Sequence, residues 1–342
     1  MAFKIKGSRI VVTGGTGSVG RAIVRRLLEL EARTVRVLSR DESKQFEMGL
    51  EFAEEEARLR YLVGDVRDRR RLARALNGAD AVIHTAALKH VPSCEYNPYE
   101  AVQTNVLGVQ NIIEAAIRCG VKRVVNLSTD KAAMPDNTMG ASKLLGEKLI
   151  TAGNYQNAAA GSLFASTRFG NVLGSRGSVL TVVRELVTEG KPVPITDPAM
   201  TRFVLTPKGA VDLVLDALTN MLGGEVFVRK MPVVKLGDLI EVYAECVARE
   251  LGRDPASVEF KTIGFRPGET LYEDLVTEEE GKRTLETETD YVVLPAFRFR
   301  RVEYKHPGAK EAKITGYNSH QQTPLTRDEV RAFLADGGLV KG

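Results

Sequence analysis

The stretch TGGTGSVGRAIVRRLLE, residues 13–29, decides the fold. It follows the apolar run RIVV, residues 9–12, and its own apolar residues recur at helical intervals. Gly14, Gly17 and Gly20 have the TGxxGxxG spacing, in which absent side chains let the backbone approach a pyrophosphate at a helix N-terminus. The position between a first strand and an amphipathic helix predicts a dinucleotide site. Its expected contacts are Thr13, Gly14, Thr16, Gly17, Ser18, Val19 and Gly20.

Four further short apolar runs alternate with helical patterns. They are TVRVLSR (34–40), LRYLVGDV (59–66), DAVIHTAA (80–87) and RVVNLSTD (123–130). Continuous apolar strands separated by helices indicate a parallel sheet that is covered on both faces. Right-handed crossovers then give a Rossmann-type, doubly wound α/β fold.

Composition limits the class of protein. The 342 residues are 43% hydrophobic, which supports a sizeable core. No apolar run approaches the roughly 20 residues of a membrane span, and the N-terminus lacks a signal-peptide pattern. The three cysteines lack metal-ligand spacing, so we expect a reduced, cytoplasmic protein without a metal. The net charge of +4 is mild, and the basic run at residues 65–76 is typical of a solvated helix face rather than of nucleic-acid binding.

The end of the second strand favours NADP over NAD. An NAD enzyme usually has Asp or Glu there to bind the ribose hydroxyls. Here Ser39 and Arg40 occupy that place and Lys44 follows one helical turn later. A hydroxyl and two cations suit the 2′-phosphate of NADP. The nearby Asp41 argues against this choice, and an exposed arginine after a strand is often only solvated.

The next two strands extend the expected cofactor site. Asp65 and Val66 follow the third strand, where the adenine would lie. Ala86, Ala87 and Lys89 follow the fourth, along the cofactor and the floor of the substrate pocket.

Asp130 and Lys131 stand together at the carboxyl end of the fifth strand, the edge where open α/β sheets bind ligands. A protonated carboxyl beside a neutral amine would place one acid and one base side by side. The alternative is a surface ion pair. Met139 and Lys143 follow four residues apart, on one face of a predicted helix.

Five motifs together carry a family resemblance. They are AALKHVPSCEYNP (86–98), STDKA (128–132), RFGNVLGSRGSV (168–179), ITDPAMTRF (195–203) and RPGETLYEDL (266–275). The chain resembles the extended short-chain dehydrogenase/reductase superfamily. Within it, the chain is most similar to the C5-inverting UDP-N-acetylglucosamine 4,6-dehydratases of bacterial surface-polysaccharide and capsule synthesis.

The resemblance implies a lyase with a tightly held NADP that is reduced and reoxidised in each turnover. C4 of UDP-N-acetylglucosamine is oxidised, water leaves across C5 and C6, and the hydride returns to C6. The resemblance also implies a homo-oligomer, either a dimer or a larger assembly such as a hexamer.

The resemblance also implies residue roles. Asp130 is the acid at C6, Lys131 the base at C5, and Lys143 the anchor of the nicotinamide ribose. To act as a base, Lys131 needs a lowered pKa, which we expect Lys89 and Lys143 to provide.

Position 139 departs from the superfamily pattern, which has a tyrosine four residues before the lysine. Met139 offers no acid–base chemistry and is expected to pack against the nicotinamide or the sugar. Another group must then take the C4 hydroxyl proton. Thr129, Asp130 and Lys131 are the candidates, and we favour Asp130 or Lys131.

The second half supplies the expected substrate contacts. We expect residues 1–165 to form the NADP-binding domain and residues 166–342 to form mainly a smaller α/β sugar-nucleotide lobe, interleaved with the first. Asn171 suits a sugar or diphosphate oxygen, and Arg202 a phosphate. Arg266 suits the diphosphate and Glu269 the ribose hydroxyls, although an ion pair between these two is the alternative. Arg176 either faces the site or stabilises a loop.

Three rival functions remain open. A UDP-sugar 4-epimerase shares the fold and cofactor but needs no acid at C6. A C5-retaining dehydratase differs only in stereochemistry. A noncatalytic NADP-binding module is supported only by the loss of the tyrosine.

Overall fold

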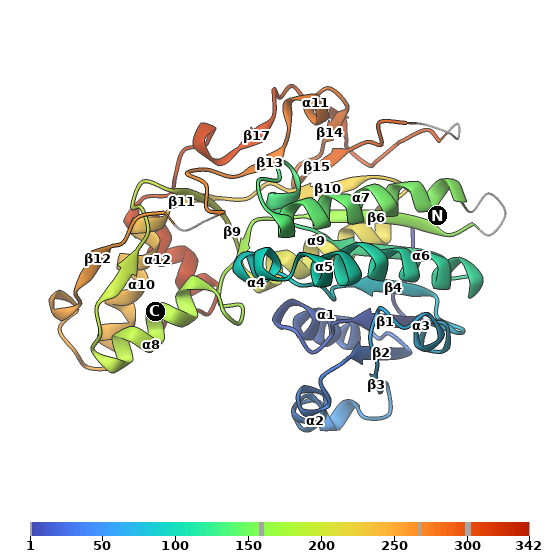
Figure 1. Cartoon of the computed structure of the whole chain (residues 1–342), viewed down its shortest axis with the longest axis horizontal. Coiled ribbons are helices and arrows are strands. Elements are labelled where there is room, and N and C mark those ends of the chain that lie inside the picture. Colours follow the sequence, from blue (N-terminus) through green and yellow to red (C-terminus); the bar gives the residue numbers. More distant parts are fainter. Residues whose placement is uncertain (1, 157–160, 266–267, 298–301, 342) are drawn as a thin grey trace.

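The computed structural model describes residues 2–156, 161–265, 268–297 and 302–341. A ten-stranded sheet forms the centre of this described part (Figure 1). From one edge to the other its strands are β16 (Lys310–Glu311), β14 (Thr284–Glu286), β15 (Asp290–Val293), β10 (Val226–Arg229), β6 (Leu163–Arg168), β5 (Arg123–Leu127), β4 (Ala81–His84), β1 (Arg9–Thr13), β2 (Thr34–Ser39) and β3 (Leu59–Val63).

The strand order confirms the predicted Rossmann-type fold. Strands β1 to β6 and β10 run parallel, with β1 between β2 and β4. The register places Val12 beside Val37 on one side and Ile83 on the other. Strands β15, β14 and β16 continue the sheet in antiparallel pairs. Since β10 and these three strands come from beyond residue 165, the second half contributes to the same sheet, and the domain boundary at 165 stays a prediction.

Helices cover both faces because the strand residues alternate between two cores. Val12 packs in a core with α1 (Ser18–Glu29) and α9 (Pro207–Asn220). Val11 packs in the opposite core with α3 (Arg69–Leu76) and α6 (Gly108–Arg118), and α7 (Thr138–Gln156) lies next to α6 on this face. The remaining helical segments of this half are α2 (Glu42–Glu51), η1 (Ala53–Glu55), α4 (Val91–Tyr96), α5 (Pro98–Ala101), η2 (Val102–Leu107) and η3 (Asp130–Ala132).

A smaller lobe lies beyond the carboxyl ends of the parallel strands, at the left of Figure 1. Its core joins α8 (Val179–Glu189), α10 (Leu236–Glu250) and α12 (Arg327–Asp336). Its small strands and short helix are β7 (Asn171–Val172), β8 (Val193–Ile195), β9 (Thr201–Leu205), β11 (Val233–Lys235), β12 (Phe260–Thr262) and η4 (Pro255–Ser257). Strands β13 (Asp274–Val276) and β17 (Tyr317–Asn318) pair with each other and pack in the core of the large sheet, next to α11 (Glu278–Gly281) at the top of Figure 1. The short helix η5 (Ser319–Gln321) follows β17.

Within the described ranges, no helix combines the length and the apolar character that a bilayer-spanning helix needs.

A fully buried arginine connects the large sheet to α7 on one side and to β13 and α11 on the other. Arg168 ends β6, and its guanidinium donates to Glu147 of α7 at 2.6 Å and to Glu280 of α11 at 2.8 Å. It also donates to the carbonyl oxygen of Leu275 in β13 at 2.8 Å. Planar donors on three sides let one side chain hold three elements in a fixed relation.

We expect Arg168→Met to lower the free energy of unfolding by about 3–5 kcal/mol, because it leaves Glu147 and Glu280 buried without their cation. Urea unfolding followed by circular dichroism measures this. The control is Lys208→Met, which breaks an exposed pair with Asp212 and should cost at most about 1 kcal/mol. Equal losses in the two variants would contradict a central role for the buried network.

Candidate functional site

The turn between β1 and α1 has the shape of a phosphate-binding loop. Gly14 has φ +67°, and a Cβ there would lie 2.7 Å from the backbone nitrogen of Ala86 after β4. A Cβ on Gly20 would lie 2.6 Å from the Gly14 carbonyl oxygen. Gly17 is the N-cap of α1 and provides no side-chain hydrogen bond to the first turn. The glycines therefore serve close backbone packing and leave the start of the helix suited to an anion.

The hydroxyl groups around this loop brace it. Thr13 Oγ1 lies 2.7 Å from His84 Nδ1, which joins the ends of β1 and β4. Thr16 Oγ1 lies 2.9 Å from Ser39 Oγ at the end of β2. These contacts bring together three strand ends that the sequence assigned to one cofactor site.

Arg176 reaches the loop from the second half of the chain. Its backbone N–H donates to Ser18 Oγ at 3.0 Å, and its guanidinium donates to the carbonyl oxygen of Thr16. Lys89 Nζ donates to the carbonyl oxygen of Arg176 at 2.8 Å. Arg176 therefore stabilises its own loop and also lies against the predicted phosphate site, so the two alternatives are not exclusive.

The two cations proposed for NADP each lie beside a carboxylate. Arg40 is exposed and lies 3.7 Å from Asp65, while Lys44 pairs with Asp41, the residue that caps α2. Exposed pairs of this kind are worth at most about 1 kcal/mol, so an incoming phosphate can replace them.

The other residues predicted to contact the cofactor differ in burial. Val66 is buried in the core under α3 and α6, whereas Val19 and Ala87 are half-buried. Their contact with a cofactor stays a prediction.

Asp130 and Lys131 lie just beyond β5, in η3, with Asp130 only 3% exposed. Asp130 Oδ1 accepts hydrogen bonds from Thr129 Oγ1 at 2.6 Å, from the Lys131 backbone N–H at 2.8 Å and from Lys131 Nζ at 3.2 Å. Asp130 Oδ2 is buried and accepts no hydrogen bond from the described residues. The pair is therefore not an exposed surface ion pair.

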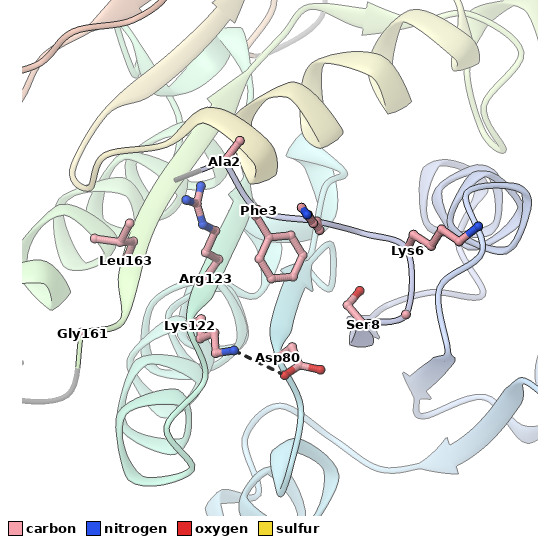
Figure 2. Close-up of a pocket in the computed structure, with 11 residues that line it drawn as sticks. Ala2, Phe3, Lys6, Ser8, Asp80, Lys122, Arg123, Gly161 and Leu163 are labelled. Carbon is pink, nitrogen blue, oxygen red and sulfur yellow. Dashed lines mark ion pairs between the residues drawn. The ribbon is translucent and has the colours of Figure 1, made fainter.

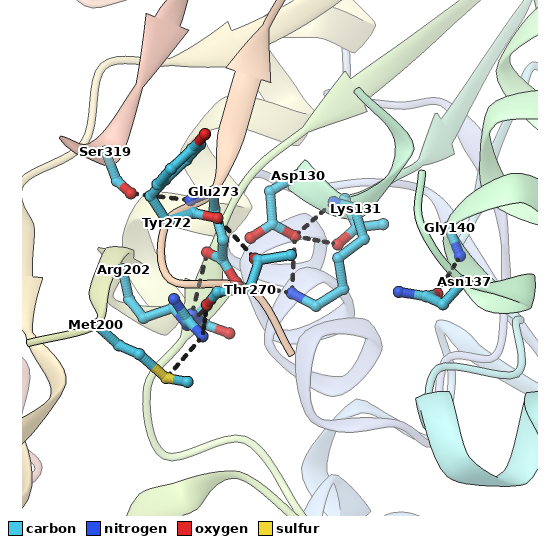
Figure 3. Close-up of polar contacts among 12 residues, drawn as sticks. Asp130, Lys131, Asn137, Gly140, Met200, Arg202, Thr270, Tyr272, Glu273 and Ser319 are labelled. Carbon is cyan, nitrogen blue, oxygen red and sulfur yellow. Dashed lines mark hydrogen bonds and ion pairs between the residues drawn. The ribbon is translucent and has the colours of Figure 1, made fainter. Parts of the chain in front are cut away.

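Glu273 is a candidate site residue that sequence reasoning missed. It precedes β13, is 6% exposed, and accepts a hydrogen bond from Lys131 Nζ at 2.9 Å (Figure 3). Its carboxylate also lies 3.3 Å from Arg202 Nε and 3.5 Å from Asn171 Nδ2. The available signal was its place in RPGETLYEDL, four residues after Glu269, but spacing alone did not show which glutamate turns toward the strand end.

The expected protonation states of Asp130 and Lys131 are wrong in this structure. Burial raises the pKa of Asp130, but the charge of Lys131 and the donated hydrogen bonds outweigh it and hold that pKa well below its usual range. Burial lowers the pKa of Lys131, but Asp130 and Glu273 outweigh it and hold that pKa above its usual range. Lys89 and Lys143 do not contribute the lowering that the sequence suggested. Burial and the neighbouring Asp130 raise the pKa of Glu273 to about 8.

Helix α7 brings Lys143 to the same strand end. Lys143 is buried, its Nζ donates to the Leu127 carbonyl oxygen, and burial lowers its pKa to about 8. A side chain at Gly140 would collide with the carbonyl oxygen of Lys131, so the glycine permits the close approach of α7. Met139 is 4% exposed and packs with Cys94 and Ala101.

The structure describes some of the residues that are predicted to bind the substrate. Arg202 is buried and donates to the Thr270 carbonyl oxygen at 2.8 Å, in addition to its pairing with Glu273. Its role at a phosphate stays a prediction, as does that of the half-buried Glu269. Arg266 lies outside the described residues.

A hollow of about 490 Å³ lies elsewhere (Figure 2). Lys122, Arg123 and Leu163 line it at the amino ends of β5 and β6, the edge opposite Asp130. None of the predicted site residues lines it, so its size does not mark the functional site.

We expect Lys143→Met to raise the free energy of unfolding by about 1–3 kcal/mol near pH 7. Burying the charged amine costs about 1.4 kcal/mol per unit of lowered pKa, and the lost hydrogen bond to Leu127 offsets about 1 kcal/mol of the gain. Above pH about 8 the folded wild type loses this proton, while the unfolded chain keeps it until about 10.5. Wild-type stability should rise over that interval and the advantage of the variant should shrink.

Urea unfolding at neutral and alkaline pH tests this. Lys148→Met, an exposed position on the same helix, is the control and should change stability by no more than about 0.5 kcal/mol. A Lys143→Met protein that is less stable than wild type near pH 7 would contradict the buried charge.

Comparison with known proteins places the chain among sugar-nucleotide enzymes by similarity. The profile of the family described as "Polysaccharide biosynthesis protein" matches residues 10–295. An uncharacterized membrane protein of Methanocaldococcus jannaschii is 46% identical over 331 residues, 97% of this chain and 96% of the relative. A UDP-N-acetylglucosamine 4,6-dehydratase (inverting) of Campylobacter jejuni is 42% identical over 85% of this chain and 84% of the relative. A UDP-glucose 4-epimerase of Rickettsia felis is 38% identical over 97% and 96%.

Solved structures agree with the fold. Pen from Bacillus thuringiensis is 38% identical, with a TM-score of 0.93 over 99% of this chain and 100% of that one. DesIV, a dTDP-glucose 4,6-dehydratase from Streptomyces venezuelae with NAD bound, is 26% identical, with a TM-score of 0.67 over 77% and 86%. The family profile covers most of the chain and these relatives share its length, so the chain belongs to the polysaccharide biosynthesis protein family, within the extended short-chain dehydrogenases/reductases.

Proposed function

We propose that the protein is an NADP-dependent UDP-N-acetylglucosamine 4,6-dehydratase that inverts C5. The observation that carries the proposal is the buried cluster of Asp130, Lys131 and Glu273 at the carboxyl end of β5. An elimination needs a proton acceptor and a proton donor side by side, and this cluster holds both kinds of group. The Campylobacter relative, named as an inverting dehydratase of this substrate, supports the assignment.

The loop at Gly14–Gly20, the end of β2 and Lys143 would hold the cofactor. When bound, NADP supplies the acceptor for the C4 hydride and the donor that returns it to C6. The backbone of the loop suits the pyrophosphate, and Lys143 suits the nicotinamide ribose. Ser39, Arg40 and Lys44 suit the 2′-phosphate.

The residues at the carboxyl end of β5 carry out the proton transfers. Because Asp130 is held as a carboxylate, it is suited to accept the C4 hydroxyl proton first. Once protonated, the same carboxyl can give that proton to the departing C6 oxygen. Lys131 takes the C5 proton. Met139, packed between α4, α5 and α7, leaves no acid–base group on the helix at that position.

The main alternative is a UDP-sugar 4-epimerase, which the Rickettsia relative favours by its name. Epimerisation at C4 needs one group to exchange a hydroxyl proton and has no use for an acid at C6. The additional buried carboxyl of Glu273 beside Lys131, the proposed base, is the feature that favours elimination. A C5-retaining dehydratase and a noncatalytic NADP-binding module complete the alternatives.

The nucleotide extracted from the purified protein should be mainly NADP. Arg40→Asp should weaken NADP binding by about 1.5–3 kcal/mol, the scale of a hydrogen bond to a charged group. Arg74→Asp, which makes the same charge change at an exposed position of α3, is the control and should keep the wild-type affinity. Extraction of mainly NAD would refute the choice of NADP.

The activity itself is tested by NMR. Purified protein incubated with UDP-N-acetylglucosamine should give a 4-keto product with a new C6 methyl signal. A 4-epimerase would give the C4 epimer without a methyl group, and a binding module would give no product. Analysis of the product configuration at C5 separates inversion from retention.

Variants then test which residues transfer the protons. Asp130→Asn and Lys131→Ala should each lower kcat by about 10²-fold or more, with smaller changes in KM, as expected for loss of a general acid or base. Met139→Leu is the control, since a volume-conserving apolar change costs less than about 1.5 kcal/mol and leaves the strand end intact. Near-normal turnover by the Asp130 or Lys131 variant would refute its role.

A further inference from the structure

The proposed base carries a proton that it must lose. Lys131 lies between two buried carboxylates, with Nζ 3.2 Å from Asp130 Oδ1 and 2.9 Å from Glu273 Oε1. Both contacts favour the ammonium form, which cannot take a proton from C5. A dehydratase with this geometry needs a nearby group that relieves Lys131 of its proton before elimination.

We infer that Glu273 takes the proton of Lys131 before elimination, so that a proton relay across one hydrogen bond creates the base at C5. The inference rests on the proposed dehydratase function and deepens it. Glu273 acts through Lys131, and is therefore a positioning residue for the proton.

The elimination balances in protons and electrons. Lys131 passes a proton to Glu273 and becomes a neutral amine. The amine takes the C5 proton, and the electron pair of the C5–H bond forms the C5–C6 double bond. The C6–O bond breaks with its electrons on oxygen, and Asp130 donates to that oxygen the proton that it took from the C4 hydroxyl, so that water leaves. When C6 is then reduced, C5 takes a proton from solvent and Glu273 releases its proton to solvent. The cluster then has Lys131 charged and both carboxyls ionised, as at the start of the turnover.

The charges of the cluster make this transfer feasible. Above pH about 8, Lys131 and Arg202 supply two positive charges, and Asp130 and Glu273 supply two negative charges. Moving a proton from Lys131 to Glu273 removes one charge of each sign and leaves the sum at zero. In a buried site, a transfer that creates no net charge avoids the large cost of desolvating an unpaired ion.

The surrounding contacts hold Glu273 in place for this role. Its backbone N–H donates to Ser319 Oγ at 2.9 Å. Its carboxylate lies 3.3 Å from Arg202 Nε and 3.5 Å from Asn171 Nδ2. Asp130 Oδ2 is buried and accepts no hydrogen bond from the described residues, which leaves it available for the C4 hydroxyl proton.

The inference fixes the sign of a pH dependence. Burial and Asp130 raise the pKa of Glu273 to about 8, so below that pH Glu273 already holds a proton and cannot take that of Lys131. The kcat should rise as pH increases through about 8. Lys143 on α7 also titrates near pH 8, and loss of its charge would act in the opposite direction.

The charged groups around Glu273 must be considered in reading that profile. They are Asp130 and Lys131 on η3, Arg202 on β9, and the adjacent Asp274. His320 of η5 contacts the ring of Tyr272, the residue before Glu273. Comparison of wild type with a variant at Glu273 alone isolates its contribution from theirs.

The test variant is Glu273→Gln, which keeps the size of the side chain and an oxygen for Lys131 but cannot take a proton. We expect kcat to fall by about 10²-fold, the range for loss of a proton-transfer group, with KM changed only a few-fold. The rise of kcat through pH about 8 should disappear, and exchange of the substrate C5 proton with solvent deuterium should slow in parallel. Ser319→Ala removes the backbone support without touching the carboxyl, and should keep the wild-type pH profile.

The outcomes separate this inference from the proposed function. If wild type forms no 4-keto, 6-methyl product, the dehydratase proposal is refuted. If wild type forms the product and Glu273→Gln keeps its kcat and its rise near pH 8, the relay is refuted and the function stands. If Glu273→Gln fails to fold, Glu273→Asp keeps a titratable group. A reduced kcat with a displaced pH limb in that variant supports the relay, and an unchanged limb overturns it.

Discussion

The site depends on the buried guanidinium of Arg168. One side of this group holds Glu147 of α7, and the other holds Glu280 of α11 and the Leu275 carbonyl oxygen of β13. Lys143 lies one helical turn before Glu147, and Glu273 lies two residues before Leu275. Lys143, the proposed cofactor ligand, and Glu273, the proposed proton acceptor, therefore keep their positions relative to β6 and its neighbour β5 through a single side chain. Arginine suits this task because its planar donors are directional and its charge is permanent.

The electrostatics of the strand end arise from long-range contacts. The sequence places Lys131 near other cations, which is why a lowered pKa was expected. In the fold, Glu273 arrives from 142 residues away and meets Lys131 at 2.9 Å. At such separations in a buried site, one carboxylate outweighs more distant lysines. The order of charges along the chain was therefore a poor guide to the charge around Lys131.

The difference between local patterns and long-range contacts explains how much of the fold and of the site could be predicted from the sequence. The glycine loop, the parallel strands and the strand end at Asp130 are local patterns, and each follows from a backbone requirement that sequence spacing records. Gly14 shows this directly, because its φ of +67° and its approach to Ala86 exclude a side chain. Glu273 and Arg202 meet η3 only because β9 and the segment before β13 fold over it, and no local period encodes that contact. Arg168 was visible in the motif RFGN, but its partners on α7 and α11 were not.

The proposed roles of α7 and of the residues after β5 differ, and this difference gives a physical reason for methionine at position 139. In the proposed chemistry, protons move among Asp130, Lys131 and Glu273, all of which lie on η3 or before β13. Helix α7 then has only to hold the cofactor through Lys143, and residue 139 is free to fill the apolar space beside Cys94 and Ala101. Gly140 next to it must stay small, because α7 lies directly on the Lys131 carbonyl. An apolar residue at 139 thus keeps the helix packed closely beside the strand end.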